Sequence, residues 1–381
     1  MLVFQGALSV VLLVGAGLFV RSLDNVRSLR MGYDVEPVLY VTPNPRGLRP
    51  SDEERALLGR QLEEAAKGLP EVESATRALT VPFWEHWSTD LHVAGIDSVR
   101  RLGHFTLQGA SPDYFRTVGT RILRGRGITA ADRKGAPLVA VVSEAMGRIL
   151  WPGKDAVGQC MKVEADTVPC TTIVGIAENI KQSSLADDPG LHYYLPIEQF
   201  NPQSFRLLVR TRGDAARSAE TVRRRLQQLM PGESYITVTP MREIVGSRQR
   251  SWEFGAKMFL VFGALALVLA GIGLYSVIAF NVAQRTQELG VRIALGAELR
   301  DLLRLVVGEG IRFAIAGVLL GGAVALLAGR WVGPLLFAES PRDPLVYGGV
   351  TAVLLVVAVV ASAVPAMRAS RVDPNLALRA E

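Results

Sequence analysis

The sequence predicts an α-helical membrane protein with four transmembrane helices and a large α+β extracytoplasmic domain between helices 1 and 2. Three observations predict this class. Of the 381 residues, 49% are hydrophobic and only 20% are charged, whereas soluble proteins average about 25% charged residues. Four runs are apolar enough to cross a hydrocarbon layer about 30 Å thick, which takes roughly 20 helical residues. The chain between the first two runs has mixed polarity and many strand-like segments.

The four apolar runs are expected to form transmembrane helices. The first run could instead be a cleavable signal peptide, which carries basic residues before its apolar core and a small-residue cleavage site after it. Here no Lys or Arg precedes the run, and Arg21 follows it directly, so a retained helix is favoured. The runs are Leu2 to Val20, Phe259 to Phe280, Leu305 to Ala328 and Leu345 to Val364. We therefore expect helix 1 at 1–21, the extracytoplasmic domain at 22–254 and a domain with helices 2–4 at 255–381.

The basic residues of the short loops predict the orientation, because cytoplasmic loops are enriched in Lys and Arg. The cytoplasmic arginines would be Arg285, Arg292, Arg300 and Arg304 in the second-to-third loop, and Arg368, Arg371 and Arg379 in the tail. The third-to-fourth loop has only Arg330 and Arg342, so it and the large domain are expected outside. Arg21, Arg27 and Arg30 oppose this orientation, but they belong to a long translocated domain, for which the rule is weak.

The extracytoplasmic domain contains two stretches with the same strand, helix, strand pattern. Residues 38–42, 52–67 and 72–81 form the first, and residues 205–210, 215–230 and 235–238 the second. A Pro-containing turn follows each helix, as expected where a helix must stop. Two βαβ halves, at 22–84 and 201–254, would build one subdomain, and residues 85–200 would form an inserted strand-rich subdomain. Because βαβ units are common, the alternative is a coincidental similarity.

The two cysteines, Cys160 and Cys170, flank a predicted hairpin turn near residue 165. In a hairpin centred on that residue they would face each other on one side, and an oxidising exterior would permit a disulfide. The alternative is two free buried thiols. With no third or fourth cysteine, a structural zinc site is not expected.

Motifs of enzymatic chemistry are absent from the sequence. It contains no G-x-x-x-x-G-K-[ST] phosphate loop, no G-x-S-x-G elbow and no H-E-x-x-H metal motif, and its four histidines match no helical ligand pair. We therefore expect no catalytic residue, no metal ligand and no cofactor bound by this chain. Gly317 and Gly321 form a G-x-x-x-G within the third apolar run, where small residues permit close helix packing.

The charged residues do not indicate a nucleic-acid partner. The formal net charge is +6, but aromatic residues make up only 7% and the basic residues are spread along the chain rather than gathered on one face. Arginines flanking the membrane near anionic lipid account for part of the excess. Near the start of the third apolar run, Glu309 and Arg312 have the i and i+3 spacing of an ion pair on one helix face, and snorkelling of the two charges to the cytoplasmic border is the alternative. No chain of acidic residues and histidines crosses the membrane, which argues against a proton-coupled carrier.

The second-to-third loop carries a candidate docking segment. Glu288 and Arg292 are spaced to pair at i and i+4, while Leu289 and Ile293 supply apolar contacts. Gly290 and Gly296 lower the helix propensity of the segment, so a docked partner is a reasonable source of the segment's structure. The alternative is a solvated connector. The segment comprises Glu288, Leu289, Gly290, Val291, Arg292, Ile293, Ala294, Leu295 and Gly296.

At these residues the sequence resembles the FtsX-like permeases, membrane subunits of ABC transporters. The segment from Glu288 to Ala297 is similar to the signature that follows the second span in this family. The tail from Pro365 to Arg379 is similar to the end of the family's sequences. In the exported domain, 111–115, 125–132, 142–145 and 150–153 look like the MacB-like periplasmic core domain. The resemblance covers essentially the whole chain.

The resemblance implies a porter-like subdomain with an inserted Sabre-like subdomain, a multi-pass position in the bacterial inner membrane, and a dimer with a second permease copy or half. It implies a separate cytoplasmic ABC ATPase that binds ATP and Mg²⁺ and docks on the segment from Glu288 to Gly296. ATP-driven motion would then be relayed outward, a mechanism called mechanotransmission. Efflux members would add a periplasmic adaptor and an outer-membrane channel. The alternative is a signal relay that activates a cell-wall hydrolase or senses antimicrobial peptides.

One departure from the family is expected to matter. Its members usually have a basic, amphipathic segment before the first span, whereas this chain starts inside the span. The chain therefore resembles the second half of a double-length permease, or a sequence with a late start.

Overall fold

The computed structural model describes residues 2–46, 51–185, 188–200, 205–285 and 299–369. The chain divides into two units, a membrane unit of residues 1–29 with 249–381 and a soluble unit of residues 30–248. The soluble unit thus lies inside the expected boundaries at 22 and 254. The reason is that the first two long helices continue as helices beyond their apolar runs.

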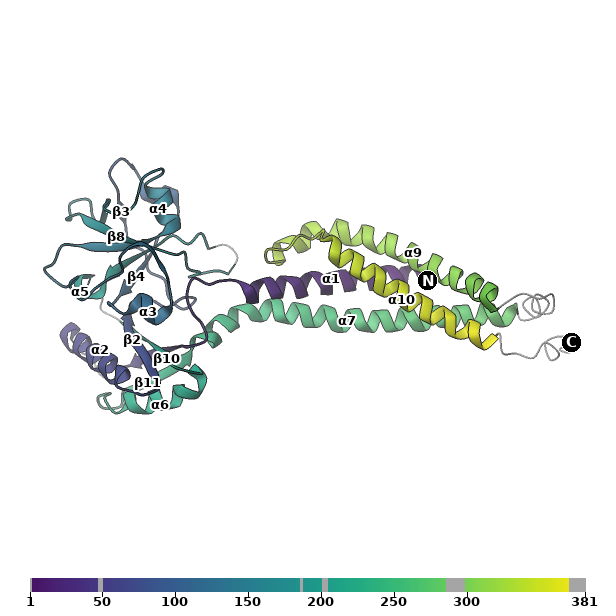
Figure 1. Cartoon of the computed structure of the whole chain (residues 1–381), viewed down its shortest axis with the longest axis horizontal. Coiled ribbons are helices and arrows are strands. Elements are labelled where there is room, and N and C mark those ends of the chain that lie inside the picture. Colours follow the sequence, from purple (N-terminus) through teal and green to yellow (C-terminus); the bar gives the residue numbers. More distant parts are fainter. Residues whose placement is uncertain (1, 47–50, 186–187, 201–204, 286–298, 370–381) are drawn as a thin grey trace. The chain divides into compact units, whose positions relative to one another are not determined.

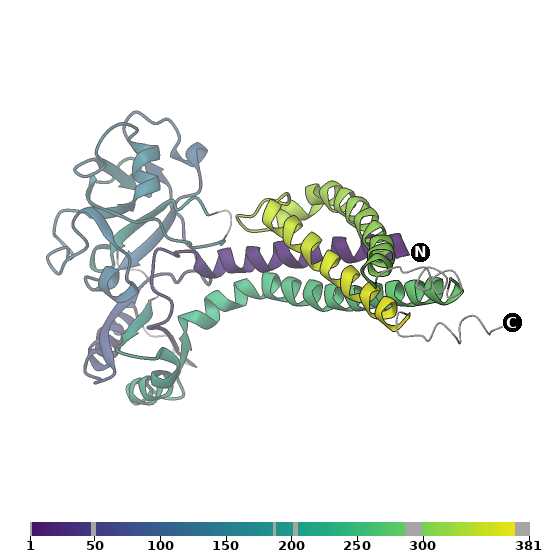
Figure 2. The same cartoon turned by 45° about the vertical axis from the view of Figure 1, so that its right-hand side comes forward.

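The membrane unit contains four long helices (Figures 1 and 2). Each of them is long and apolar enough to cross a membrane, which confirms the predicted number of spans. The first ends later than the expected residue 21, because the polar turns after Arg21 remain helical. The helices are α1 (Leu2–Ser28), α7 (Met241–Gln284), α9 (Leu299–Val332) and α10 (Pro344–Ala369), and the turn Gly333–Leu335 follows α9.

The soluble unit begins and ends with a four-stranded lobe. Its strands are β1 (Val38–Asn44), β2 (Val72–Ala78), β10 (Arg206–Thr211) and β11 (Tyr235–Pro240), and its helices are α2 (Asp52–Lys67) and α6 (Ala215–Gln227). The strand order is β11-β1-β10-β2, and every neighbouring pair is antiparallel. The two predicted strand, helix, strand stretches are present, but the strands of each stretch do not pair with each other. Each stretch instead encloses a strand of the other, which is the split βαβ arrangement.

Apolar and capping residues explain this lobe. The apolar faces of α2 and α6 pack on the sheet through a core that includes Leu39, Leu62, Leu207 and Leu226. Ser51 begins α2 with a capping box, because its hydroxyl accepts from the backbone N–H of Glu54 and the Glu54 carboxylate accepts from the N–H of Ser51.

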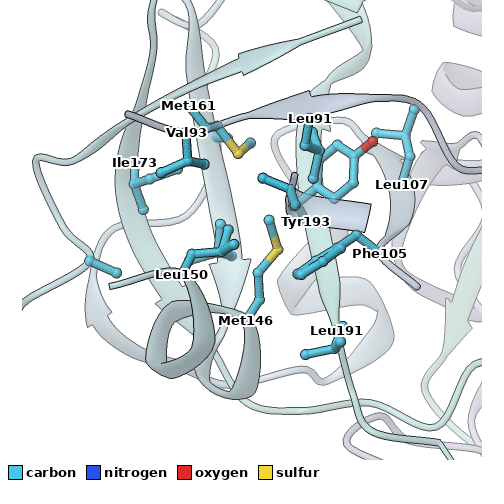
Figure 3. Packing of buried hydrophobic residues seen from close by; sticks show 14 of the residues in the cluster. Leu91, Val93, Phe105, Leu107, Met146, Leu150, Met161, Ile173, Leu191 and Tyr193 are labelled. Carbon is cyan, nitrogen blue, oxygen red and sulfur yellow. The ribbon is translucent and has the colours of Figure 1, made fainter. Parts of the chain in front are cut away.

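The inserted lobe, residues 85–200, continues the same sheet in the order β4-β9-β6-β8-β7-β3, with β5 pairing to β8. Its core contains Tyr193, Leu107, Met146 and Met161, each fully buried (Figure 3). The strands are β3 (Leu91–His92), β4 (Thr106–Ala110), β5 (Ile122–Gly125), β6 (Val139–Ser143), β7 (Cys160–Val163), β8 (Thr171–Ala177) and β9 (His192–Pro196). The short helices are η1 (Val99–Leu102), α3 (Tyr114–Val118), α4 (Glu144–Leu150) and α5 (Ile197–Phe200).

The hairpin of β7 and β8 has a different register from the expected one. Cys160 lies opposite Thr172 rather than Cys170, and Met161 lies opposite Thr171. Cys170 precedes the first paired residue of β8, so the two cysteines are diagonal neighbours. They are nevertheless joined by a disulfide with a Cα–Cα distance of 5.6 Å, and both are exposed rather than buried.

Candidate functional site

The predicted docking segment, Glu288 to Gly296, lies outside the described residues. Its borders are described: α7 ends at Gln284, and α9 begins at Leu299. Next to the segment, Arg285 Nη1 lies 3.5 Å from Glu309 Oε1 and so connects the end of α7 to α9. The expected pairing of Glu309 with Arg312 is therefore wrong. A neighbouring helix supplies the nearer cation, which spacing within α9 could not reveal.

Gly317 and Gly321 lie against α1. A Cβ atom added at Gly317 would be 3.2 Å from the Cα of Gly6. A Cβ atom at Gly321 would be only 2.5 Å from the carbonyl oxygen of Ala7 and 2.6 Å from the Cβ of Val10. Real side chains do not approach as closely as a Cβ at Gly321 would, so α1 and α9 require glycine there for their present separation, whereas a Cβ at Gly317 would need α1 to move by a few tenths of an ångström.

Polar contacts hold the other end of α1 to the connection between α9 and α10. The Ser22 hydroxyl accepts a hydrogen bond of 2.7 Å from the N–H of Phe337. The Asn25 amide donates to Glu339 at 3.1 Å, and Arg21 Nε lies 3.7 Å from the same carboxylate. The last turns of α1 are therefore fixed to the helical hairpin of α9 and α10.

Within the soluble unit, Glu178 binds the segment that follows α1. Arg30 donates two hydrogen bonds to its carboxylate, at 2.9 and 2.8 Å, and Arg121 donates three more, one of them from its backbone N–H. Burial alone would raise the pKa of Glu178, but the bonds from the two arginines outweigh it and lower that pKa to about 2. Glu178 is therefore ionised at neutral pH and holds Arg30 in place.

The next residues follow the surface of the inserted lobe closely. Gly32 has a φ of +78°, and a Cβ atom there would lie 2.2 Å from the carbonyl oxygen of Asn179. Its own carbonyl accepts from the Thr120 hydroxyl at 2.8 Å, and the N–H of Lys181 donates to the carbonyl of Met31 at 2.9 Å. Glycine is thus needed where this segment contacts the lobe.

The start of α7 is held by the four-stranded lobe. Met241 follows directly after Pro240, the last residue of the edge strand β11. Met241, Ile244 and Val245 are buried in the first turns of the helix. Pro240 is compatible with this strand because an edge strand leaves one side unpaired. The helix therefore begins as a rigid extension of the sheet.

The arginines that oppose the predicted orientation all have acidic partners. The pairs are Arg21 with Glu339, Arg27 with Glu253, and Arg30 with Glu178. Their charges are thus partly neutralised locally.

The sequence motifs of the exported domain have structural roles. Asp132 accepts two hydrogen bonds from Arg126, at 2.7 and 2.9 Å, and closes the turn between them. The Ser143 hydroxyl accepts from the N–H of Met146 as the N-cap of α4 and also from the N–H of His192. The residues that bind the segment after α1, Glu178 in particular, were not predicted from the sequence. Only its position at the end of a buried apolar strand indicated a carboxylate that needs partners.

No cluster of metal ligands was found in the described part of the chain, where groups of three or more His, Cys, Asp or Glu were sought. One cavity of the inserted lobe, of about 580 Å³, is lined by residues 88–92, 96–100 and 103–105. It is open and polar, and its Arg100 and Asp90 are already paired at 2.7 Å.

Two family models match the chain. The model of the MacB-like periplasmic core domain matches residues 5–229, and that of the FtsX-like permease C-terminal region matches residues 260–374. Pyoverdine export ATP-binding/permease protein PvdT of Pseudomonas putida is 28% identical over 268 residues, which cover 68% of this chain and 40% of that protein. Macrolide export ATP-binding/permease protein MacB 1 of Yersinia pestis is 26% identical over 289 residues, covering 72% and 43%. The chain thus spans about two fifths of the length of these curated relatives.

Among solved structures, the periplasmic region of MacB from Actinobacillus actinomycetemcomitans aligns with a TM-score of 0.42 and 14% identity, over 60% of this chain and 97% of that one. The family models decide the assignment, because the periplasmic model alone matches more than half of the chain. The chain belongs to the family that combines a MacB-like periplasmic core domain with an FtsX-like permease C-terminal region, and the core domain lies between the first and second transmembrane helices.

Proposed function

We propose that this chain is the permease subunit of an exporter in the bacterial inner membrane, and that it works by mechanotransmission. A separate cytoplasmic ATPase would bind ATP and Mg²⁺, and its motion would change the conformation of the periplasmic domain. A second permease copy or half, a periplasmic adaptor and an outer-membrane channel are proposed as further partners. The export proteins named among the relatives support an exported compound as substrate.

One observation carries this proposal: within the soluble unit, the segment that follows α1 and the first turns of α7 are both held by well-packed contacts. The chain after α1 is held by Arg30 and Glu178, and α7 begins with buried residues directly after β11. Rigid connections transmit small displacements, because packed interiors deform little. A flexible tether to a binding domain would not need such contacts.

The absence of a phosphate loop from the sequence supports a division of labour. In this proposal, ATP hydrolysis takes place in the partner and reaches the chain through the segment from Glu288 to Gly296. The ion pair of Arg285 and Glu309 lies next to that segment and would connect it to two transmembrane helices at once.

A charge reversal tests the docking segment. The variant Glu288→Arg with Arg292→Glu should lose co-purification with the ATPase and the stimulation of its ATP turnover. The matched control is Glu144→Arg with Arg148→Glu, an exposed pair of the same i, i+4 spacing on α4. Unchanged capture and turnover in the first variant would reject the docking role.

Affinity capture from native membranes tests the function as a whole. An exporter should bring an ABC ATPase together with a periplasmic adaptor. Capture of an ATPase with a cell-wall hydrolase or a sensor kinase would instead establish a signal relay. Capture without any ATPase would reject both.

A further inference from the structure

We infer that the periplasmic domain contains a built-in shear joint, because the residues that follow α1 first contact one lobe of it, whereas the first turns of α7 extend from the other. The inference deepens the proposed function and rests on it only for the source of the motion. Its structural part, the joint itself, concerns contacts within the soluble unit alone.

The residues after α1 are attached to the inserted lobe. Arg30 binds Glu178, which follows β8, and Gly32 packs on Asn179. The N–H of Asp34 donates to the carbonyl of Val118, at the end of α3, at 2.7 Å. These partners belong to residues 85–200, while the Asp34 carboxylate also accepts from Arg210 of β10, in the four-stranded lobe, at 2.7 Å.

The first turn of α7, in contrast, is attached to the four-stranded lobe. Met241 continues β11, which pairs with β1 along six residues from Leu39 to Asn44. A displacement of α1 relative to α7 therefore acts on two different lobes.

The sheet is narrowest where the two lobes meet. β2 and β4 pair at one position, Ala78 opposite Ala110, whereas β2 and β10 pair at six. The N–H of Leu79 donates to Gly109 at 3.0 Å, and the N–H of Ser111 donates to Arg77 at 3.2 Å. These two bonds flank the single pair.

Polar side chains occupy much of the junction. Gln108 is fully buried, and its amide donates to the Gln182 side chain at 2.7 Å and contacts the Thr80 hydroxyl. Arg77 of β2 donates to Glu198 of α5 at 2.6 Å. Leu79, which directly follows β2, belongs to the apolar core of the inserted lobe.

Such a junction favours sliding over separation. Side-chain hydrogen bonds tolerate small displacements and can exchange partners, whereas interlocked apolar cores resist them. α3 also packs against β2 and β10, and this keeps the lobes in contact while they move. The lobes should therefore shift by a small sliding motion when α1 and α7 are displaced.

An engineered disulfide tests the joint. The N–H groups of Leu79 and Ser111 donate hydrogen bonds on either side of the pair formed by Ala78 and Ala110. Ala78 and Ala110 are therefore a non-hydrogen-bonded pair, in which Cα atoms lie about 4.5 Å apart. That separation lies at the short end of the disulfide range. Ala78→Cys with Ala110→Cys, in a chain carrying Cys160→Ser and Cys170→Ser to avoid exchange, should form a lock on oxidation. The matched control is Thr42→Cys with Thr237→Cys, opposite residues within the four-stranded lobe.

Spin-label distances in the full chain in lipid nanodiscs provide the readout. Labels at Arg148 of α4 and Arg223 of α6 report between lobes, and labels at Glu53 of α2 and Arg223 report within one lobe. Without any ATPase, the distance distribution between lobes should be broader than the one within the lobe. The Ala78–Ala110 lock should narrow it, and the Thr42–Thr237 lock should not.

Equal widths in the unlocked chain, or no narrowing by the lock, would overturn the joint whatever the function. With the ATPase and a non-hydrolysable nucleotide present, the distance between lobes should shift in the unlocked chain alone. A broad distribution without this shift would retain the joint and count against the proposed function.

Discussion

The two helices that enter the soluble unit differ in how the membrane unit holds them. Of the apolar window of α1, 39% is buried, against 11% for α7. α1 fits against the glycines of α9, whereas α7 contacts α1 through stacked Phe19 and Phe259 rings 5.1 Å apart and leaves most of its large apolar side chains outward. In a membrane, exposed apolar surface costs nothing, so close packing rather than hydrophobicity fixes a helix. The difference indicates that α1 is a fixed element and that α7 has a surface free for lipid or a second copy.

The largest expected effect comes from breaking the contact of α1 with α9. Gly321→Leu should lower the free energy of unfolding of the membrane unit by about 3 kcal/mol, because its side chain has no room beside Ala7. Unfolding by sodium dodecyl sulfate in mixed micelles measures this. Gly322→Leu, at a position with no atom within 4 Å, is the control and should not destabilise. Equal effects of the two would contradict the fixed position of α1.

The second effect concerns the attachment of α1 in the soluble unit. Glu178→Gln should lower the stability of this unit at pH 7 by about 2 kcal/mol, discounted for the half-exposed arginines. Because the folded-state pKa of about 2 lies below the ordinary 4.5, the contribution is complete above pH 4.5 and is lost as the pH falls toward 2. Urea unfolding followed by near-ultraviolet circular dichroism should show the difference from wild type vanish over this range. Glu144→Gln, in an exposed pair, should change little.

A smaller effect is expected at the outer end of α1. Asp343 accepts from Arg21 and from the backbone N–H of Leu345 at 2.7 Å, at the start of α10. Asp343→Ala should therefore destabilise the membrane unit, because it removes the side chain that caps α10. The same micelle unfolding applies, with exposed Arg342→Ala as the control. A loss no greater than that of the control would show that this contact does not fix α1.

The smallest expected effects come from valine substitutions that compare α1 with α7 directly. Val14 of α1 is 2% exposed, whereas Val268 of α7 is 57% exposed. Val14→Ala should destabilise the membrane unit by about 1 kcal/mol, and Val268→Ala by less than about 0.5 kcal/mol. If Val268→Ala weakens self-association of the permease in chemical cross-linking, the free face of α7 contacts a second copy. A larger loss of stability from Val268→Ala than from Val14→Ala would reverse the comparison.

The membrane helices and the secondary structure of the four-stranded lobe were predictable because they follow from local properties. Apolar length identified the four spans, and alternating strands and helices identified both halves of the lobe. Strand pairing was not predictable in the same way, since β1 pairs with β10 and β11, which follow it by more than 160 residues in sequence. The sequence pattern indicated the strands and helices but not which strands pair with each other.

The errors have the same origin. Spacing within α9 suggested Arg312 as the partner of Glu309, but Arg285 approaches from α7. Symmetry about a presumed turn placed Cys160 opposite Cys170, but the turn is centred elsewhere and Thr172 takes that position. Glu178 could not be assigned a role, because its partners Arg30 and Arg121 are brought to it only by the folded lobe.

The bond between Cys160 and Cys170 has a practical consequence. These are the only two cysteines of the sequence, so the oxidised chain offers no reactive sulfhydryl of its own. A cysteine introduced at one surface position becomes a unique chemical handle. Treating intact cells with a membrane-impermeant maleimide would then report, loop by loop, which connections face the periplasm, starting with Ser340→Cys between α9 and α10.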